Sequence, residues 1–295
     1  MRALVVGASG LVGGAILRAL GDEATGTYLT RPRAGLLRLD ARDRRAFADL
    51  IRSSRAEVVY LPAAQPNVEW CETHPDEARS LNIEPVIAAL TVAEGRPIIG
   101  FSTDYVFDGA VGPYAEDDVP APLNAYGRIK LELEETLAAG VRNLVVRTTG
   151  VFGLEDPPAK NFVLRLLESL RQGRPVRVPA DQISTPTYAP DLAHGAITIA
   201  ESGAGGIWHV SGPDLMARTE LATMAASAFH LPPELVIPVP TSELGQVAPR
   251  PLRAGLRCER YEAAFGRPGR PTREALAELR RELGALAEAD RYGAT

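Results

Sequence analysis

The sequence predicts an α/β fold, in which a doubly wound parallel sheet is followed by a smaller α+β lobe. Through the first half of the 295-residue chain, short β-branched runs alternate with longer helical patterns. Such alternation is typical of a parallel sheet with helices on both faces. After Gly150, closely spaced prolines divide the chain into short pieces, which indicates a less regular lobe. We therefore expect one domain over residues 1–150, with contributions from about 184–211, and a second over 151–295.

The expected strands are short and rich in apolar residues. They lie at Ala3–Val6, Glu23–Tyr28, Glu57–Leu61, Pro97–Phe101 and Arg142–Arg147. Helical spacing of apolar residues predicts helices between and after them. These lie at Leu11–Leu20, Asp43–Ser53, Pro75–Glu94, Asn124–Ala138, Arg218–Phe229 and Thr272–Leu286. Because crossovers between parallel strands are right-handed, these helices are expected to cover both faces of the sheet.

The composition argues against several classes of protein. With 45% apolar residues, a chain of this length can bury a large core without a disulfide or a structural metal. A net charge of −5 argues against nucleic acid or an anionic membrane surface as a partner. No run of about 18 apolar residues occurs, so no membrane span is expected.

Cysteine, histidine and lysine are all sparse. Cys71 and Cys258 lie far apart and outside any C-x-x-C pattern, so we expect reduced thiols in a cytoplasmic protein. The four histidines show no metal-binding spacing, and no catalytic metal is expected. The 32 basic residues include only two lysines, Lys130 and Lys160. A lysine retained in so arginine-rich a chain indicates a position that needs an amine.

A glycine-rich turn, G-x-x-G-x-x-G, follows the first expected strand and opens the first helix. Glycines there allow a tight turn and let the backbone approach a pyrophosphate, whose charge the helix N-terminus stabilises. The alternative is a turn with a structural role alone. The placement favours a Rossmann-type, dinucleotide-binding domain. The residues expected to contact the cofactor in this turn are Gly7, Ser9, Gly10, Leu11, Val12 and Gly13.

The end of the second expected strand bears on the choice between NADP and NAD. A site for NAD usually places an acidic residue about 20 residues past the glycines, where it binds the ribose 2′-hydroxyl. This chain has Arg31 and Arg33 there instead. Because a guanidinium suits a 2′-phosphate, NADP(H) is favoured. NAD(H) stays open, since arginine is common throughout the chain.

Tyr126 and Lys130 lie four residues apart at the start of an expected helix, which places both side chains on one face. An unperturbed phenol, with a pKa of about 10, is a poor acid at neutral pH. An adjacent ammonium lowers that pKa and can hold the nicotinamide ribose, so the pair is suited to protonating a carbonyl oxygen. The alternative is an incidental pair on a solvated helix.

The segment GFSTDYVFDG, residues 100–109, closes the fourth expected strand. Ligands of a doubly wound sheet bind at the carboxyl ends of its strands, so Ser102, Thr103 and Asp104 are expected to face the nicotinamide. A hydroxyl there can hydrogen-bond a substrate carbonyl as negative charge develops on its oxygen. Asp104 can equally serve as a turn cap.

Together these motifs resemble a known family. The glycine spacing is similar to that of extended short-chain dehydrogenase/reductases. The strings STDYVFDG, APLNAYGRIK and VVRTTGVFG, with Asp181-Gln182 and Thr185-Pro186-Thr187 beyond them, resemble the dTDP-4-dehydrorhamnose reductase family over nearly the whole chain. That resemblance implies NADPH-dependent reduction of the 4-keto group of a nucleotide-linked deoxysugar, with dTDP-4-dehydrorhamnose as the leading substrate and dTDP-L-rhamnose as its product.

The resemblance also implies roles for individual residues. Thr103, Tyr126 and Lys130 are the implied catalytic set. Asp40 would lie beside the adenine, and Ala63 and Ala64 would line the cofactor after the third strand. The residues implied to hold the nucleotide sugar are Thr103, Asp104, Asn161, Gln182 and Arg250, of which the last three can equally be structural.

Departures from the family pattern leave alternatives open. The family often has Trp and Tyr after Arg147, where this chain has Gly150 and Phe152, which would alter a wall of the substrate pocket. Family members that dimerise through a metal carry Glu where this chain has Ala15, so no structural Mg²⁺ is expected. A homodimer is expected by analogy alone. A different function also stays open, because the family resembles the NADP-binding regulatory β subunit of methionine adenosyltransferase.

Overall fold

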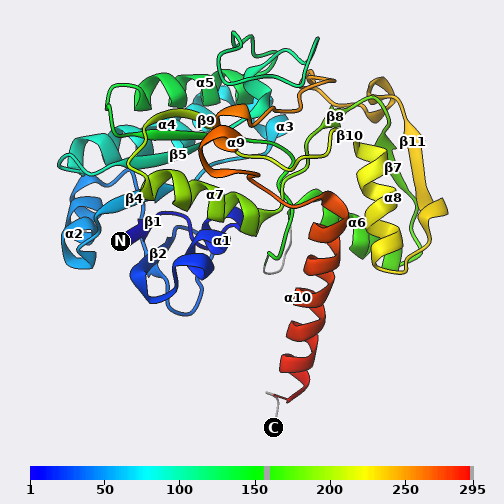
Figure 1. Ribbon diagram of the computed structural model, residues 1–295, viewed down its shortest axis with the longest axis horizontal. Coiled ribbons are helices and arrows are strands. Elements are labelled where there is room, and N and C mark those ends of the chain that lie inside the picture. Colours follow the sequence, from blue (N-terminus) through cyan, green and yellow to red (C-terminus); the bar gives the residue numbers. More distant parts are fainter. Residues whose placement is uncertain (156–159, 293–295) are drawn as a thin grey trace.

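The computed structural model describes residues 1–155 and 160–292. Within them, seven parallel strands form one sheet in the order β3-β2-β1-β4-β5-β6-β9 (Figure 1). The strands span Ala3–Val5 (β1), Ala24–Tyr28 (β2), Leu37–Arg38 (β3), Val58–Leu61 (β4), Ile98–Thr103 (β5), Leu144–Thr148 (β6) and Gly206–His209 (β9). The chain starts in the middle of the sheet and extends it in both directions, so its crossover helices cover both faces. The predicted doubly wound α/β fold is confirmed.

Helices enclose a separate hydrophobic core on each face of the sheet. One core includes Phe47, Ile83 and Leu133, and the other includes Ile16 and Leu192. The helices over the first core are α2 (Arg44–Ser54), α4 (Pro75–Val92) and α5 (Ala125–Leu137). Those over the second are α1 (Leu11–Leu20) and α7 (Ala189–Glu201). Both faces of the parallel sheet are therefore buried, as parallel strands require.

The C-terminal part has a third core of its own, at the right of Figure 1. Two small sheets contribute to it, a parallel pair of β7 with β11 and an antiparallel pair of β8 with β10. The strands span Val176–Pro179 (β7), Ile183–Ser184 (β8), Met216–Ala217 (β10) and Val236–Val239 (β11). The helices that line this core are α6 (Phe162–Arg171), α8 (Arg218–Ala228) and α10 (Thr272–Tyr292), whereas α9 (Glu259–Phe265) packs beside β9 of the main sheet. This part forms the smaller lobe.

Helix α10 differs from the expectation, because it continues past Leu286 to Tyr292 and extends away from the body of the molecule (Figure 1). Within the described residues, no helix combines the length and the apolar character that crossing a bilayer requires. Ten of the described α-helices and strands are not among the expected ones, namely α3 (Val68–Thr73), α6, α7, α9, β3, β7, β8, β9, β10 and β11. α7 begins at a proline in its first turn, where the missing N–H costs no helical hydrogen bond.

Local interactions place α5 tightly against the end of β5. Asn124 is the N-cap of α5, and its side-chain oxygen accepts a hydrogen bond from the N–H of Gly127 at 2.8 Å. A Cβ on Gly127 would lie 2.2 Å from the carbonyl oxygen of Tyr105, so only glycine permits this approach. The first turn of α5, which carries Tyr126, therefore lies directly beside the segment that follows β5.

Candidate active site

Residues 7–13 form a tight turn between β1 and α1. Gly7 has a φ of +88°, and a Cβ on it would lie 2.9 Å from the Cα of Ala63. A Cβ on Gly13 would lie 2.4 Å from the carbonyl oxygen of Gly7. No side chain caps α1 at Gly10, so the N–H groups of the first helical turn stay available to an anion. The turn fits the pyrophosphate of a dinucleotide.

Replacing Gly13 by Ala is expected to weaken NADPH binding by about tenfold or more, because the added methyl group meets backbone atoms that cannot yield. Gly14→Ala is the matched control, since Gly14 is not among the expected cofactor contacts and its Cβ would lie 3.3 Å from the flexible end of the Arg18 side chain. Fluorescence titration with NADPH measures the dissociation constant of each variant. Equal affinities for the two variants would contradict the assignment of this turn.

The residues expected at the adenosine end differ in how fully other side chains of the protein already pair with them. Arg31 follows β2, and its buried Nη1 atom has no hydrogen-bond partner among the described residues. The same Nη1 atom forms a long ion pair with Oε1 of Glu155, at 3.9 Å. Arg42 pairs with Asp40 at 2.7 Å and holds the pKa of that carboxyl below its usual range. Arg31 thus keeps a donor for a 2′-phosphate, whereas Asp40 already has a cationic partner.

Tyr126 and Lys130 lie one turn apart on α5. The Lys130 ammonium is 5.9 Å from the centre of the Tyr126 ring and donates to the carbonyl oxygen of Phe101 at 3.0 Å. Burial lowers the pKa of Lys130 to about 8. Burial also raises the pKa of Tyr126, and the Asp104 carboxylate adds to that increase. The expected lowering of the Tyr126 pKa by Lys130 is therefore not found: the pKa is raised, and the phenol keeps its proton at neutral pH.

The rate of the enzyme is expected to fall as pH rises through about 8, because Lys130 then loses its positive charge. Burial disfavours the charged ammonium, so the proton leaves at a lower pH than from an exposed lysine. Measuring kcat/KM from about pH 6 to about pH 10 locates this decline. Lys130→Arg does not titrate in that range, so it should remove the decline at a lower overall rate. A decline that persists unchanged in Lys130→Arg would assign it to another group.

Thr103 and Asp104 form a buried hydrogen-bonded pair at the end of β5. Thr103 donates to Oδ1 of Asp104 at 3.0 Å, and Thr149 donates to Oδ2 at 2.6 Å. Burial raises the pKa of Asp104 to about 6, although both hydrogen bonds oppose the increase. These contacts hold the Thr103 hydroxyl at the end of β5, where its hydrogen bonding to Tyr126 acts to lower the pKa of that phenol.

Ser102 does not face the nicotinamide side as expected. Its hydroxyl donates to Oε1 of Glu134 on α5 at 2.5 Å. Successive side chains of a strand point to opposite faces, so Ser102 and Thr103 cannot both line one site. The structure therefore leaves Thr103 as the hydroxyl beside Tyr126.

The residues expected to hold the substrate have different surroundings. Asn161 is the N-cap of α6, and its side-chain amide donates to the carbonyl oxygen of Gly153 at 3.2 Å. The side-chain oxygen of Gln182 accepts from Arg218 at 3.1 Å. Arg250 donates from Nη2 to Glu69 at 2.5 Å, while its Nη1 is buried with no hydrogen-bond partner in the described part of the chain. A substrate role for each of the three stays a prediction. Of the three, Arg250 is the one with a buried polar atom that lacks a hydrogen-bond partner among the described residues.

Arg218, at the start of α8, is a candidate that the sequence motifs do not indicate. Its guanidinium lies 4.6 Å from the centre of the Phe162 ring. Burial lowers its pKa, and the positive charges of Arg250 and Arg165 lower it further. Three guanidinium groups thus act on one another here, which suits a diphosphate. No local signal distinguishes Arg218 in a chain so rich in arginine, because only the fold brings it near Arg250.

Two positions that depart from the family pattern lie in hydrophobic cores. Phe152 is 1% exposed and packs against Tyr188 with ring centres 5.7 Å apart, so it does not form an open pocket wall. Ala15 is 3% exposed in the core between α1 and the sheet. Among the described residues, no three His, Cys, Asp or Glu side chains gather closely enough to hold a metal ion. The absence of Mg²⁺ at Ala15 stays a prediction.

The glycine turn ends β1, and the Tyr126 region lies beyond β5, with only β4 between these strands. A dinucleotide bound at the turn can therefore extend across the carboxyl ends of the strands toward Tyr126. This arrangement defines an NAD(P)-dependent oxidoreductase of the short-chain dehydrogenase/reductase type. Within that class, the chain belongs to the family described as RmlD substrate binding domain, whose model matches residues 1–284.

Individual relatives agree with this assignment. The chain is 34% identical over 271 residues to methionine adenosyltransferase 2 subunit beta of Danio rerio, covering 88% of this chain and 84% of that protein. It is 31% identical over 283 residues to a dTDP-4-dehydrorhamnose reductase of Sinorhizobium fredii, covering 90% and 92%. The crystal structure of dTDP-4-dehydrorhamnose reductase from Bacillus anthracis in complex with NADP superposes with a TM-score of 0.84 at 25% identity, covering 95% and 99%.

Proposed function

We propose that this chain uses NADPH to reduce the 4-keto group of a nucleotide-linked deoxysugar, with dTDP-4-dehydrorhamnose as the leading substrate and dTDP-L-rhamnose as its product. The observation that carries the proposal is the position of Tyr105. Its ring centre lies 6.0 Å from that of Tyr126, and the Arg250 guanidinium lies 6.0 Å from the same ring centre. The proposed proton donor and the proposed anion-binding group therefore lie a short separation apart, beside one aromatic ring. A substrate with a carbonyl in its sugar and a diphosphate beside it matches this separation.

The roles of the residues follow from their chemistry. When bound, NADPH supplies a hydride to the carbonyl carbon. Tyr126 donates its proton to the carbonyl oxygen, which completes the alcohol. The positive charge of Lys130 stabilises the phenolate left behind, and the Thr103 hydroxyl orients the carbonyl. The phenol is protonated at neutral pH because its pKa is raised, so it starts the reaction in the form of an acid.

The preference for NADPH over NADH rests on Arg31. Its buried Nη1 atom lacks a hydrogen-bond partner among the described residues and gains one if a 2′-phosphate binds there, whereas NADH has no such phosphate. The Bacillus anthracis relative, whose structure is a complex with NADP, supports the same choice. Comparing the dissociation constants of NADPH and NADH tests it, and Arg31→Met should remove the difference.

Turnover tests the proposed reaction directly. Purified protein is mixed with NADPH and dTDP-4-dehydrorhamnose, and both NADPH oxidation and the sugar product are followed. Formation of dTDP-L-rhamnose is the expected result. Other dTDP- and UDP-linked 4-keto-6-deoxysugars form the comparison set. A faster reaction with one of them would change the substrate, whereas no turnover with any would overturn the proposed activity.

A regulatory role is the second candidate. The observation that favours it is the 34% identity to methionine adenosyltransferase 2 subunit beta of Danio rerio over 88% of this chain. Under this candidate, the chain binds NADP and associates with a methionine adenosyltransferase. Co-purification with such an enzyme, and a change in its rate, test the association. The presence of Thr103, Tyr126 and Lys130 favours a catalytic function without conflicting with this second one.

A further inference from the structure

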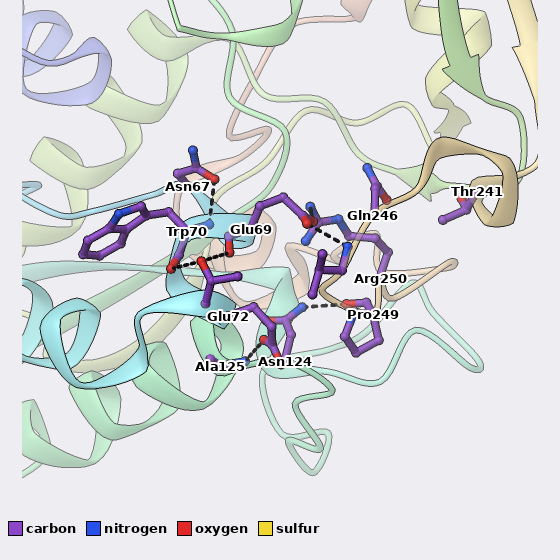
Figure 2. Close-up of polar contacts among 12 residues, drawn as sticks. Asn67, Glu69, Trp70, Glu72, Asn124, Ala125, Thr241, Gln246, Pro249 and Arg250 are labelled. Carbon is purple, nitrogen blue, oxygen red and sulfur yellow. Dashed lines mark hydrogen bonds and ion pairs between the residues drawn. The ribbon is translucent and has the colours of Figure 1, made fainter.

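Residues 247–250, here called the anion loop, carry Arg250 across the boundary between the lobe and the main sheet. The loop has no regular secondary structure, and Val247 is 67% exposed. Such a segment is mobile unless its backbone is tied down. In this chain, three hydrogen-bonding contacts, here called ties, fix the loop. They come from the other side of the boundary, from α3 and from the N-cap of α5 (Figure 2).

Glu69 on α3 makes two of these ties. One carboxylate oxygen accepts from the backbone N–H of Val247 at 2.7 Å, and the other accepts from Nη2 of Arg250 at 2.5 Å. The two contacts hold the first and the last residue of the anion loop, and Figure 2 shows Glu69 beside Arg250. Because a carboxylate fixes both a backbone group and a guanidinium, Glu69 sets the orientation of the Arg250 head.

Asn124 makes the third tie. Its side-chain nitrogen donates to the carbonyl oxygen of Pro249 at 2.8 Å, while its side-chain oxygen caps α5 at Gly127. Asn124 is completely buried and Pro249 is exposed, so the donor end of this contact is shielded from water. One side chain therefore connects the anion loop to the first turn of the helix that carries Tyr126 (Figure 2).

The three ties engage Nη2 of Arg250 and leave its Nη1 atom available. Its side chain is 8% exposed, and its Nη1 atom is buried without a hydrogen-bond partner in the described residues. A buried guanidinium N–H without an acceptor is costly, and an anion that binds there removes the cost. Glu69 occupies Nη2 and so directs Nη1 away from itself.

We propose that Glu69 and Asn124 are positioning residues that hold the anion loop so that Nη1 of Arg250 is presented to the diphosphate of a nucleotide ligand. The inference rests on the proposed sugar-nucleotide substrate and extends it, because neither residue needs to touch that substrate. Both act on binding through Arg250. Their removal should therefore raise KM and leave kcat within about twofold, since Asn124→Ser keeps a residue that caps α5.

The test measures the dissociation constant of dTDP by calorimetry, which needs no turnover. Glu69→Gln is expected to weaken dTDP binding about tenfold and Asn124→Ser about three- to tenfold, as for the loss of one hydrogen bond to a charged or a neutral group. Asp117→Asn is the matched control. It removes an ion pair with Arg260 at 3.1 Å, away from the anion loop, and should change the constant less than twofold. NADPH affinity within twofold of the original protein shows that each variant is folded.

Making the same two substitutions in an Arg250→Met variant distinguishes a role in positioning Arg250 from a general loss of rigidity. In Arg250→Met, both substitutions should have no further effect on dTDP binding, because they act through the guanidinium that is gone. If either substitution weakens binding equally in both backgrounds, or if Glu69→Gln tightens binding, the proposal is overturned. If the original protein binds dTDP and the variants bind it equally well, this proposal alone fails. If the original protein binds no dTDP, the proposed function fails and this inference fails with it.

Discussion

Replacing Tyr126 by Phe is expected to lower kcat roughly a hundred- to ten-thousandfold, because the variant keeps the ring and loses the proton donor. The hydroxyl does not hold the fold together, so NADPH affinity should stay close to that of the original protein. Stopped-flow measurement of NADPH oxidation with saturating sugar nucleotide gives the rate. Since the interaction acts in the transition state, kcat and kcat/KM should fall together.

Tyr60→Phe is the control for that substitution. Tyr60 lies on β4, is completely buried, and its hydroxyl has no hydrogen-bond partner among the described residues. Its loss should leave the rate unchanged and the stability equal or higher. A Tyr126→Phe enzyme that keeps more than about a tenth of the original rate would show that another group supplies the proton.

Replacing Arg147 by Met is expected to lower the free energy of unfolding by about 3–5 kcal/mol, because it leaves the buried Glu134 carboxylate without its cationic partner. Both side chains are 2% exposed, and Arg147 donates to Glu134 from Nη2 at 2.6 Å and from Nε at 2.9 Å. The guanidinium also lies 5.0 Å from the centre of the Phe107 ring. Equilibrium unfolding in urea measures the loss.

Two further variants make this prediction specific. Arg260→Met removes an exposed ion pair with Asp117 and should cost less than about 1 kcal/mol. Adding Glu134→Leu to Arg147→Met removes the unpaired charge and should recover part of the lost stability. If Arg147→Met is no more costly than Arg260→Met, the buried pair does not stabilise the fold. If the double variant is less stable than Arg147→Met, the cost does not come from an unpaired carboxylate.

Much of the Rossmann-type half could be predicted from local patterns. β-Branched runs and apolar spacing locate five strands of the main sheet to within a few residues, since each needs only its own sequence to be apolar on both faces. The glycine turn was recognisable because Gly7 and Gly13 have close backbone neighbours that exclude any side chain. Tyr126 and Lys130 were recognisable because helical periodicity alone places them on one face.

Other features depend on contacts between distant parts of the chain. α6 and α7 follow proline-rich segments and are stabilised by the cores that they help to form, which no local pattern reveals. The side-chain direction of Ser102 depends on the pairing of β5 and on the position of Glu134. The raised pKa of Tyr126 comes from burial, which spacing on a helix cannot indicate.

The sequence by itself determined the class of the fold, the cofactor turn and the Tyr126–Lys130 pair, because each depends on residues close together in the chain. The tertiary structure decided which arginines meet on the side proposed to bind the diphosphate and what holds them. Arg218 and Arg250 come together from separate segments, and Glu69 reaches Arg250 across 181 positions of sequence. Electrostatic and hydrogen-bonding contacts act over ångströms of space, so only the folded chain shows which distant charges become neighbours.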